Sequence, residues 1–360
     1  MQIMSRRPYI ISAIVGSLLF VGAGCISFGG ETVGTGQTDG GIFKSGDKGD
    51  NWAQKVAIPT TTGERKSINQ VSISTIVQDP QDPKAIYVGT TANGMFYSYD
   101  GGDSWLQPVQ ISRGRIPGLA VDPKNKCVIY VASENKVLKS EDCSRTWSVK
   151  YFDTRVDKVI VAVAVDGYNP KIVWAANNAG DVLKSTDGGQ SWANVKHFDS
   201  QILKLQVNAG DSRKVYVGTK GSGVWRTDDL GMNWTDLSPE YRKFAGSMDF
   251  SDMAMGVSDP KTVVFTSKYG LLRSRDGGDT WSSVDLLTPP TTSVVYYSVA
   301  LDPKNADNIY YGTSTTFYKS GNGGANWVPK KLPTSRAATA IMVDGQNSSV
   351  LYLGVTKFKE

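Results

Sequence analysis

Short apolar runs, rich in β-branched and aromatic residues, recur along the chain at nearly regular intervals. Residues 72–77, 85–90 and 95–97 form three such runs in succession, and polar turn residues such as those at 79–83 separate them. Runs this short, bounded by Gly, Pro and Asp, predict β-strands rather than helices. The same unit recurs over residues 116–147, 160–192, 202–234, 251–281 and 296–327. The pattern therefore predicts an all-β chain built from repeated sheets.

Each unit ends in a turn with the pattern Ser/Thr-x-Asp-x-Gly-x-x-Trp. The hydroxyl and carboxylate can accept bonds from the N–H groups of the turn, Gly permits positive φ, and Trp fills space between neighbouring sheets. Two copies depart from it, with Ser144 in the Gly place and Asn322 in the Asp place, and we expect both turns to form. The other structural positions are Asp47, Trp52, Asp100, Trp105, Asp142, Trp147, Asp187, Trp192, Asp229, Trp234, Asp276, Trp281 and Trp327.

This turn resembles the Asp box, or BNR repeat, of sialidases, xyloglucanases, sortilin-type receptors and photosystem II assembly-factor propellers. The resemblance covers residues 40–358 and implies a β-propeller. With a fourth strand after each Trp, every unit is an antiparallel sheet of about 45 residues, the size of a propeller blade. Seven Asp boxes predict seven blades.

The two ends of the chain complement each other. Residues 339–344 and 350–354 supply the first two strands of a unit without a box, whereas residues 41–44 supply a third strand and a box without the first two. We therefore predict an all-β fold over residues 41–360, a seven-bladed β-propeller of four-stranded antiparallel blades. Its N- and C-terminal strands pair in one blade, which leaves no free sheet edge between the ends.

The first 24 residues have the layout of a signal peptide, with Arg6 and Arg7 ahead of an uncharged apolar run at 8–24. The small residues before Cys25 resemble a bacterial lipoprotein box, although Gly22 stands where Leu is usual. The resemblance implies cleavage and lipidation at Cys25. An uncleaved anchor is the alternative. In both cases the chain is exported and anchored, to the outer side of the cell membrane or to the outer membrane. Residues 25–40 then form a flexible tether.

Charge and composition exclude several classes of function. Without the signal peptide the chain has 37 basic and 34 acidic residues, too small an excess to predict nucleic-acid binding. The single histidine, His197, rules out a zinc site with several imidazoles. We expect no metal and no cofactor.

Function is expected on the face opposite the Asp boxes, where the loops between blades lie. These connections sum to a charge of +6, so basic charge gathers at one mouth of the ring. This basic charge predicts docking of an acidic protein segment or an envelope protein complex. The alternative interpretation is a solvated surface that keeps the protein soluble. The candidate partner-binding residues are Arg65, Arg113, Arg115, Arg155, Arg242, Lys331 and Arg336.

Two catalytic alternatives compete with a non-catalytic scaffold. The sequence Arg115-Ile116-Pro117 resembles the Arg-Ile-Pro element of sialidases, which implies that Arg115 would clamp a substrate carboxylate. Two boxes precede it, however, whereas sialidases carry it before their first box. A xyloglucanase-like pair of carboxylates is the second alternative, since their separation cannot be read from sequence. A surface that binds carbohydrate through channel-facing aromatics is a further hypothesis.

Cys127 and Cys143 form an even pair in a chain predicted to be exported. Cys127 begins the second strand of its blade, and Cys143 lies in the box after the third. Antiparallel pairing of those strands puts residue 127 opposite about 142. We therefore predict a disulfide within this blade, with two buried thiols as the alternative.

Overall fold

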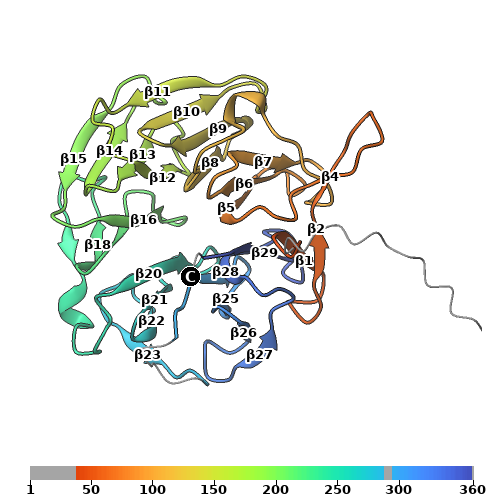
Figure 1. Ribbon diagram of the computed structural model, residues 1–360. Helices are drawn as coiled ribbons and strands as arrows, with labels where there is room; N and C mark the ends of the chain where they lie inside the picture. Colours follow the sequence, from red (N-terminus) through yellow and green to blue (C-terminus); the bar gives the residue numbers. More distant parts are fainter. Residues whose placement is uncertain (1–37, 288–293, 359–360) are drawn as a thin grey trace, which may run out of the picture. The chain divides into compact units, whose positions relative to one another are not determined.

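The repeats fold as radial antiparallel sheets around one axis, as Figure 1 shows. The computed structural model describes residues 38–287 and 294–358, and the predicted signal peptide, Cys25 and most of the predicted tether lie outside these residues. There are seven sheets of this kind, so the predicted seven-bladed β-propeller is confirmed. Among the described residues, no helix has the length and apolar character needed to cross a membrane.

Blades 1 to 6 are continuous in sequence, and their strands follow in chain order from the axis to the rim. Blade 1 contains β5 (Ile73–Gln78), β6 (Ile86–Thr90) and β7 (Met95–Ser98). Blade 2 contains β8 (Gly118–Asp122), β9 (Asn125–Ser133), β10 (Lys136–Ser140) and β11 (Ser148–Phe152). Blade 3 contains β12 (Ile160–Val165), β13 (Val173–Asn177), β14 (Asp181–Ser185) and β15 (Ala193–His197).

The next three blades repeat this order. Blade 4 contains β16 (Ile202–Val207), β17 (Val215–Thr219), β18 (Gly223–Thr227) and β19 (Thr235–Asp236). Blade 5 contains β20 (Phe250–Met255), β21 (Val263–Ser267), β22 (Gly270–Ser274) and β23 (Ser282–Val284). Blade 6 contains β24 (Ser298–Asp302), β25 (Asn305–Gly312), β26 (Thr316–Ser320) and β27 (Val328–Lys331).

Blade 7 is assembled from both ends of the chain, as predicted. Its inner strands are β28 (Ala337–Val343) and β29 (Leu351–Thr356), and its outer strands are β1 (Gly41–Ser45) and β2 (Ala53–Lys55). β1 pairs antiparallel with β29, so that Phe43 lies opposite Leu353. This pairing closes the ring, because it gives β29 a partner on its outer edge.

The core lies between neighbouring blades. Between blades 7 and 1, for example, the buried side chains of Ile42 and Tyr352 pack with those of Val88, Phe96 and Trp105. Trp105 is fully buried, and its indole N–H donates to the carbonyl oxygen of Lys55 at 2.9 Å. Full burial of a large apolar side chain contributes roughly 1.5–3 kcal/mol, so these seams hold the blades together.

Each Asp box is a turn closed by its own side chains. In blade 1, the Ser98 hydroxyl accepts the Gly102 N–H at 2.8 Å and donates to the Asp100 carboxylate at 2.6 Å. The carboxylate in turn accepts the Ser104 N–H at 2.9 Å. Gly101 and Gly102 both have positive φ, 74° and 81°, which the sequence pattern anticipated.

The two atypical boxes keep this turn. In blade 2, Ser144 occupies the second Gly position at φ 67°, and its N–H donates to the Ser140 hydroxyl at 2.9 Å. In blade 6, the Asn322 side-chain oxygen accepts the Asn326 N–H at 2.9 Å, as the carboxylate does elsewhere. The expectation that both turns form is confirmed.

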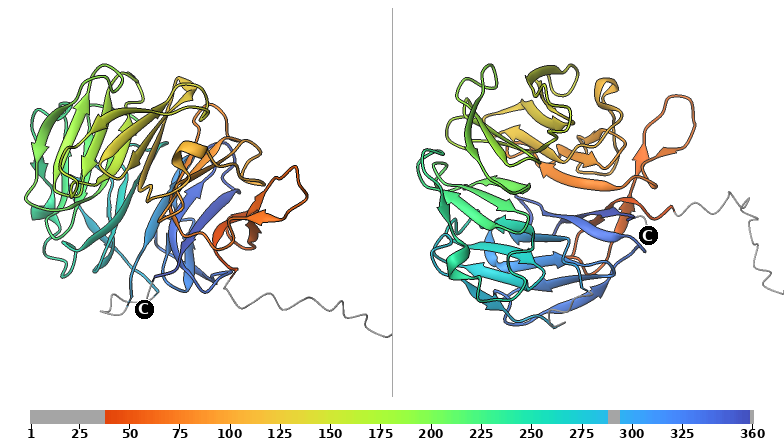
Figure 2. Two further views of the ribbon diagram at one scale, coloured as in Figure 1. Left: turned by 45° about the horizontal axis from the view of Figure 1, so that its top comes forward. Right: turned by 60° about the vertical axis from the view of Figure 1, so that its left-hand side comes forward.

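Blade 1 differs from the prediction at its rim, where the expected fourth strand is reduced to a single bridge between Tyr97 and Leu106. Pro108, two residues after Leu106, lacks an N–H, and the chain then enters the short 3₁₀ helix η1 (Val109–Ile111). A second 3₁₀ turn, η2 (Ser238–Glu240), follows the outer strand of blade 4. A hairpin of β3 (Ala57–Ile58) and β4 (Lys66–Ser67) projects from the connection between blades 7 and 1 (Figures 1 and 2).

The propeller has two distinct faces. The Asp-box face carries the boxes and the turns between first and second strands, which touch each other: the Gly101 N–H donates to the Lys84 carbonyl oxygen at 2.9 Å. The connection face, on the opposite side, carries the loops between blades and those between second and third strands. The candidate site predicted from sequence belongs to the connection face.

Candidate functional site

Arg113 and Arg115 lie on a loop that hydrogen bonds hold rigid. This loop joins blade 1 to blade 2, and Gly114 between the two arginines has φ 84°. Its N–H donates to the Ala92 carbonyl oxygen, and its own carbonyl accepts the Gly94 N–H, both at 2.9 Å. Both arginine side chains are exposed at this fixed position. Side chains on a fixed loop lose less freedom when they bind a partner.

Arg115 also lines a cavity of about 260 Å³ at the entrance of the central channel. Lys204 and Asp252 line the same cavity, with the Lys204 ammonium 2.9 Å from the Asp252 carboxylate. The second oxygen of Asp252 accepts the Val299 N–H at 3.1 Å. Lys204 is therefore neutralised locally. No ion-pair partner of Arg115 occurs in the described part of the chain, so its charge is available to a ligand.

Lys204 and Asp252 were not among the predicted site residues, because the predicted site was confined to loops, whereas both residues lie on inner strands, β16 and β20. Because the sheets are radial, each inner strand lines the channel with its edge, and its side chains alternate toward the two neighbouring blades. A charged residue within a predicted first strand was the available signal.

Arg155 is tied to carboxylates of its own chain. Its guanidinium binds Asp153 through two hydrogen bonds of 2.9 and 2.8 Å and lies 3.3 Å from Asp181 of the next blade. Asp181 is buried and also bonds His197 Nδ1 at 2.7 Å and the side-chain amide of Asn177 at 2.9 Å. Hydrogen bonds from Arg155 hold the pKa of Asp153 below its usual range. This cluster joins blades 2 and 3 and leaves Arg155 less able to bind a partner.

Arg336 is buried, with 5% of its side chain exposed. Its Nε donates to the Asp39 carboxylate at 3.1 Å, and its Nη1 donates to the Gln70 carbonyl oxygen at 3.0 Å. Asp39 also accepts the Ser335 N–H and hydroxyl, each at 2.8 Å. Although burial opposes it, this set of hydrogen bonds lowers the pKa of Asp39. Arg336 therefore does not belong to an exposed docking surface, in contrast to the prediction.

The remaining three predicted residues are exposed but dispersed. Arg65 lies in the β3–β4 hairpin, away from the channel, and Lys331 ends the outer strand of blade 6. The Arg242 guanidinium donates to the Ser238 hydroxyl at 2.9 Å. Of the seven predicted residues, only Arg113 and Arg115 share one loop beside the channel, and only Arg115 lines its cavity.

The channel entrance offers little that could act as an acid and base pair. Asp252 is the only carboxylate among the described residues that line this cavity, and it is already bonded to Lys204. Glycoside hydrolysis by the common mechanisms needs two carboxyl groups on either side of the scissile bond. In residues 38–287 and 294–358, no group of three or more His, Cys, Asp or Glu side chains could hold a metal ion.

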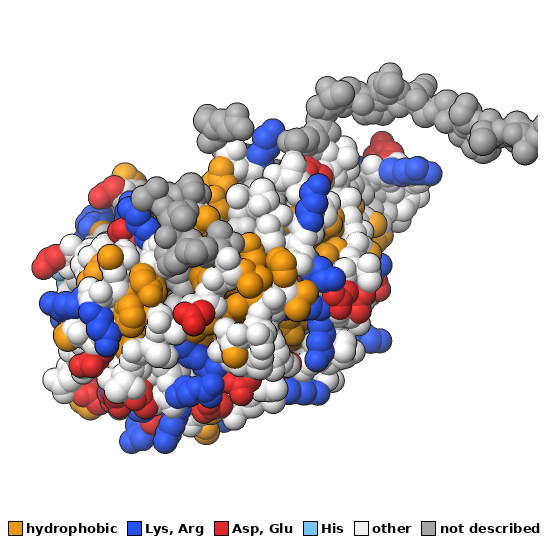
Figure 3. Space-filling view, turned by 90° about the horizontal axis from the view of Figure 1, so that it is seen from below, with side chains coloured by type: hydrophobic (Ala, Val, Ile, Leu, Met, Phe, Trp, Pro, Cys, Tyr) orange, Lys and Arg blue, Asp and Glu red, His pale blue; other side chains and the backbone are white. Residues whose placement is uncertain are grey.

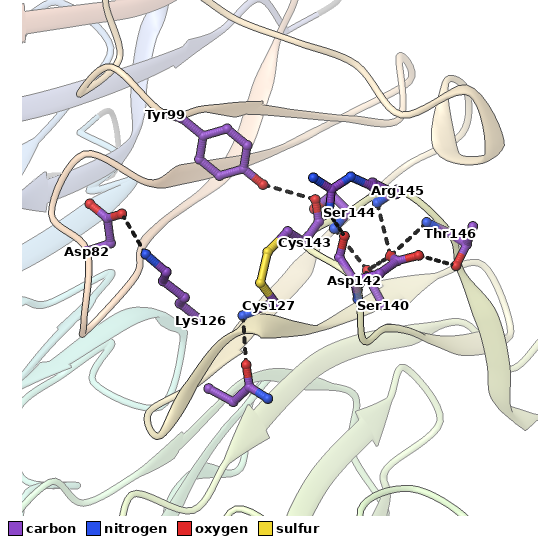
Figure 4. Close-up of a disulfide and its surroundings, with 11 residues drawn as sticks. Asp82, Tyr99, Lys126, Cys127, Ser140, Asp142, Cys143, Ser144, Arg145 and Thr146 are labelled. Atoms are coloured by element: carbon purple, nitrogen blue, oxygen red, sulfur yellow. Dashed lines mark hydrogen bonds and ion pairs between the residues drawn. A yellow bond between two sulfur atoms is a disulfide. The ribbon is translucent and has the colours of Figure 1, made fainter.

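Cys127 and Cys143 are joined by a disulfide on the Asp-box face, shown in Figure 4. The Cys143 N–H donates to the Cys127 carbonyl oxygen at 3.1 Å, which fits the antiparallel pairing used in the sequence analysis. The bridge lies on the face opposite Arg113 and Arg115, so it takes no direct part in the candidate site.

The radial sheets, the closing blade and the recurrent Asp-box turns define a BNR-type β-propeller. Within this class, a model of the family described as photosynthesis system II assembly factor YCF48 matches residues 24–207, just over half of the chain. The chain belongs to this family.

Two curated proteins illustrate the range of its relatives. A xyloglucanase of Paenibacillus sp is 25% identical over 340 residues, which cover 81% of this chain and 31% of that protein. The photosystem II assembly protein Ycf48 of Thermosynechococcus vestitus is 25% identical over 197 residues, covering 53% of this chain and 52% of that protein. The chain therefore spans less than two thirds of either relative.

Two solved structures have the same fold at low sequence identity. A GH74 xyloglucanase from Xanthomonas campestris matches with a TM-score of 0.66 at 17% identity, covering 79% of this chain and 51% of that one. YCF48 bound to a D1 peptide matches with a TM-score of 0.62 at 14% identity, covering 84% and 96%. The relatives thus include both an assembly factor and glycoside hydrolases.

Proposed function

We propose that this protein is a membrane-tethered, extracytoplasmic and non-catalytic propeller that binds an acidic segment of a partner protein at its connection face. The observation that carries the proposal is the exposed, unpaired guanidinium of Arg115 at the channel entrance, beside the neutralised Lys204–Asp252 pair. Arg113 lies two residues away on the same rigid loop. Two guanidinium groups at a fixed position suit bidentate recognition of carboxylates.

The family and one neighbour support a protein partner. The chain belongs to the YCF48 assembly-factor family, and a structural neighbour, YCF48, has been solved with a bound D1 peptide. By analogy, the partner here would be a segment of a protein undergoing assembly in the cell envelope.

The position of Asp39 supports a tether on the same side as the site. Asp39 is held by Thr334, Ser335 and Arg336, which lie in the connection from blade 6 to blade 7. The described part of the chain therefore begins at the connection face. From Cys25 the chain can extend at most roughly 50 Å to Asp39. A lipid at Cys25 would keep the docking face near the membrane, within reach of membrane-protein segments.

A glycoside hydrolase is the second candidate, favoured by the 25% identity to a xyloglucanase across 81% of the chain. It would need a second carboxylate near Asp252, which the described lining of the channel entrance does not supply. The scaffold function requires no such group, and we therefore prefer it.

The test is binding of a fluorescent hexaglutamate peptide to the purified chain, followed by fluorescence anisotropy. We expect binding that weakens between 20 and 200 mM NaCl, because the exposed charges are screened. Arg113→Glu with Arg115→Glu should weaken it at least about tenfold, since two attractive contacts become repulsive. Lys171→Glu, on the Asp-box face, is the matched control for Arg115→Glu alone and should change affinity less than about twofold.

Two results would contradict the proposal. One is equal loss of affinity in Arg115→Glu and Lys171→Glu, which would mean that net charge rather than this loop attracts the peptide. The other is turnover of xyloglucan by the purified chain that Asp252→Asn abolishes.

A further inference from the structure

At most junctions of the ring, a cation on the third strand of one blade reaches the Asp box of the next blade. It occupies the position immediately before the Ser or Thr of its own box. Its side chain donates to the carbonyl oxygen of the fourth residue of the next box. The pairs are Lys44–Gly101 (2.7 Å), Lys139–Gly188 (3.3 Å), Lys184–Leu230 (2.8 Å), Arg226–Gly277 (2.7 Å) and Arg273–Gly323 (3.1 Å).

Three of these cations are largely shielded from water. The side chains of Lys139, Arg226 and Arg273 are 11%, 10% and 4% exposed. A hydrogen bond from a charged donor to a carbonyl oxygen is stronger than one from a neutral donor. At the junction of blades 6 and 7 the equivalent Lys319 donates instead to the Asp50 carboxylate of the next box, at 2.7 Å. In the described chain, six of the seven junctions thus have a cation that is bonded to the Asp box of the next blade.

The exception is the junction of blades 1 and 2. Here Tyr97 occupies the position of the cation, and no hydrogen bond from its side chain to the box of blade 2 is present among the described residues. The acceptor carbonyl of this box belongs to Cys143. It receives the Tyr99 hydroxyl at 3.0 Å, as Figure 4 shows, and Tyr99 is 44% exposed. At this junction the neutral, exposed Tyr99 hydroxyl takes the place of the cation found at the other junctions. We therefore expect the contact between the box of blade 2 and blade 1 to be weaker than its counterparts.

The box of blade 2 is also the least favourable turn of the seven. Its fourth and fifth residues, Cys143 and Ser144, have φ of 57° and 67°, and no other box lacks glycine at both positions. A residue with a side chain is strained in this left-handed region, which favours glycine. The disulfide to Cys127 fixes the first of these two residues to the start of β9.

We infer that the Cys127–Cys143 disulfide is a redox-dependent latch that replaces the missing cation at the junction of blades 1 and 2. While the bridge is intact, the carbonyl of Cys143 stays where Tyr99 can reach it. Both cysteines are partly exposed, so a dithiol reductant can reach the bridge. The dithiol gives two electrons and two protons and becomes a disulfide itself, while the S–S bond breaks into two thiols. The strained turn is then released, and this junction loosens before the others.

The inference predicts a local effect of reduction and a specific rescue. On reduction, the amides of residues 140–147 should exchange with deuterium at least about tenfold faster, and the Tm should fall by roughly 5 °C. Cys127→Ser with Cys143→Ser should have the same effect without reductant. Tyr97→Lys in that double variant should restore at least half of the lost Tm, because it installs the cation found at the other junctions.

The control is Tyr97→Lys with the disulfide intact, which should raise the Tm much less than it does in the cysteine-free background. Three outcomes would overturn the inference: no change in Tm on reduction, loss of protection spread equally over all seven boxes, or no rescue by Tyr97→Lys. The folded state of each variant is verified beforehand by its far-ultraviolet circular dichroism. If the cysteine-free variant does not fold, the comparison is made between the oxidised and reduced native chain and the Tyr97→Lys single variant.

Discussion

At the scale of single residues, the Asp-box carboxylates stabilise turns, and their oxygens are occupied by hydrogen bonds within the turn. Asp276 shows why: its oxygens accept the Thr280 N–H at 2.9 Å and the Ser274 hydroxyl at 2.7 Å. Partial burial by itself would raise its pKa, but the bonds from Thr280 and Ser274 outweigh that and lower the pKa from 3.8 to about 2. A carboxylate saturated by its own turn is poorly placed for catalysis or ligand binding.

The lowered pKa predicts how acid acts on the fold. Because the folded pKa of Asp276 lies below its unfolded value, its contribution to stability is complete above about pH 4 and is lost as the pH falls toward 2. Asp276→Asn should lower the Tm at pH 7 and flatten its decline between pH 4 and 2. Scanning calorimetry across this range tests the expectation, and parallel curves for variant and parent would refute it.

Ser144 gives a second prediction at this scale. Its φ of 67° suits glycine, so Ser144→Gly should raise the free energy of unfolding by up to about 1 kcal/mol. The reciprocal change, Gly189→Ser at the equivalent position of blade 3 with φ 92°, should lower it by at least as much. Urea unfolding measures both. Stabilisation by Gly189→Ser would contradict this account of the turn.

At the scale of elements, the closing blade depends on a short segment ahead of β1. Asp39 and Gly40, which the sequence analysis put in the tether, are bonded to the propeller: the Gly40 N–H donates to the Asn69 carbonyl oxygen at 2.7 Å. Because Arg336 is buried against Asp39, the segment is locked beside the last connection.

Loss of this lock should be measurable. Asp39→Ala removes the Asp39 carboxylate from the buried Arg336 guanidinium and should cost about 1–3 kcal/mol of unfolding free energy. Asp211→Ala is the control, because Asp211 pairs with Arg213, which is 69% exposed, and should cost less than about 1 kcal/mol. Chemical unfolding compares the two. Equal losses would show that the Asp39 contact has no special role in closure.

Strands and turns were predictable because their signals are local. The Asp box sets its turn within eight residues, and the two incomplete ends predicted the pairing of β1 with β29. The burial of Arg336, the bridge that replaces the outer strand of blade 1, and the approach of Lys204 to Asp252 were not predictable. Each joins residues that are 48 to 297 positions apart or depends on a connection without a repeat pattern.

At the scale of the whole propeller, the two faces differ in the residues that they present. Asp boxes, cations and a disulfide stabilise one face, while the other presents Arg113 and Arg115 beside the channel. The sequence predicted a basic connection face but not which of its cations form ion pairs, because pairing depends on carboxylates that the fold brings close in the described residues. Of the seven candidate residues, pairing and position together leave Arg113 and Arg115, which lie on one hydrogen-bonded loop.

The most direct test of the docking face is site-specific photo-crosslinking in the native membranes. A photoreactive phenylalanine analogue replaces Ser112, beside Arg113, or Lys171 on the Asp-box face of the full chain. The account predicts a discrete protein adduct from position 112 that Arg115→Glu abolishes, and none from position 171. An adduct from position 171 alone, or one from position 112 that persists in Arg115→Glu, would contradict it.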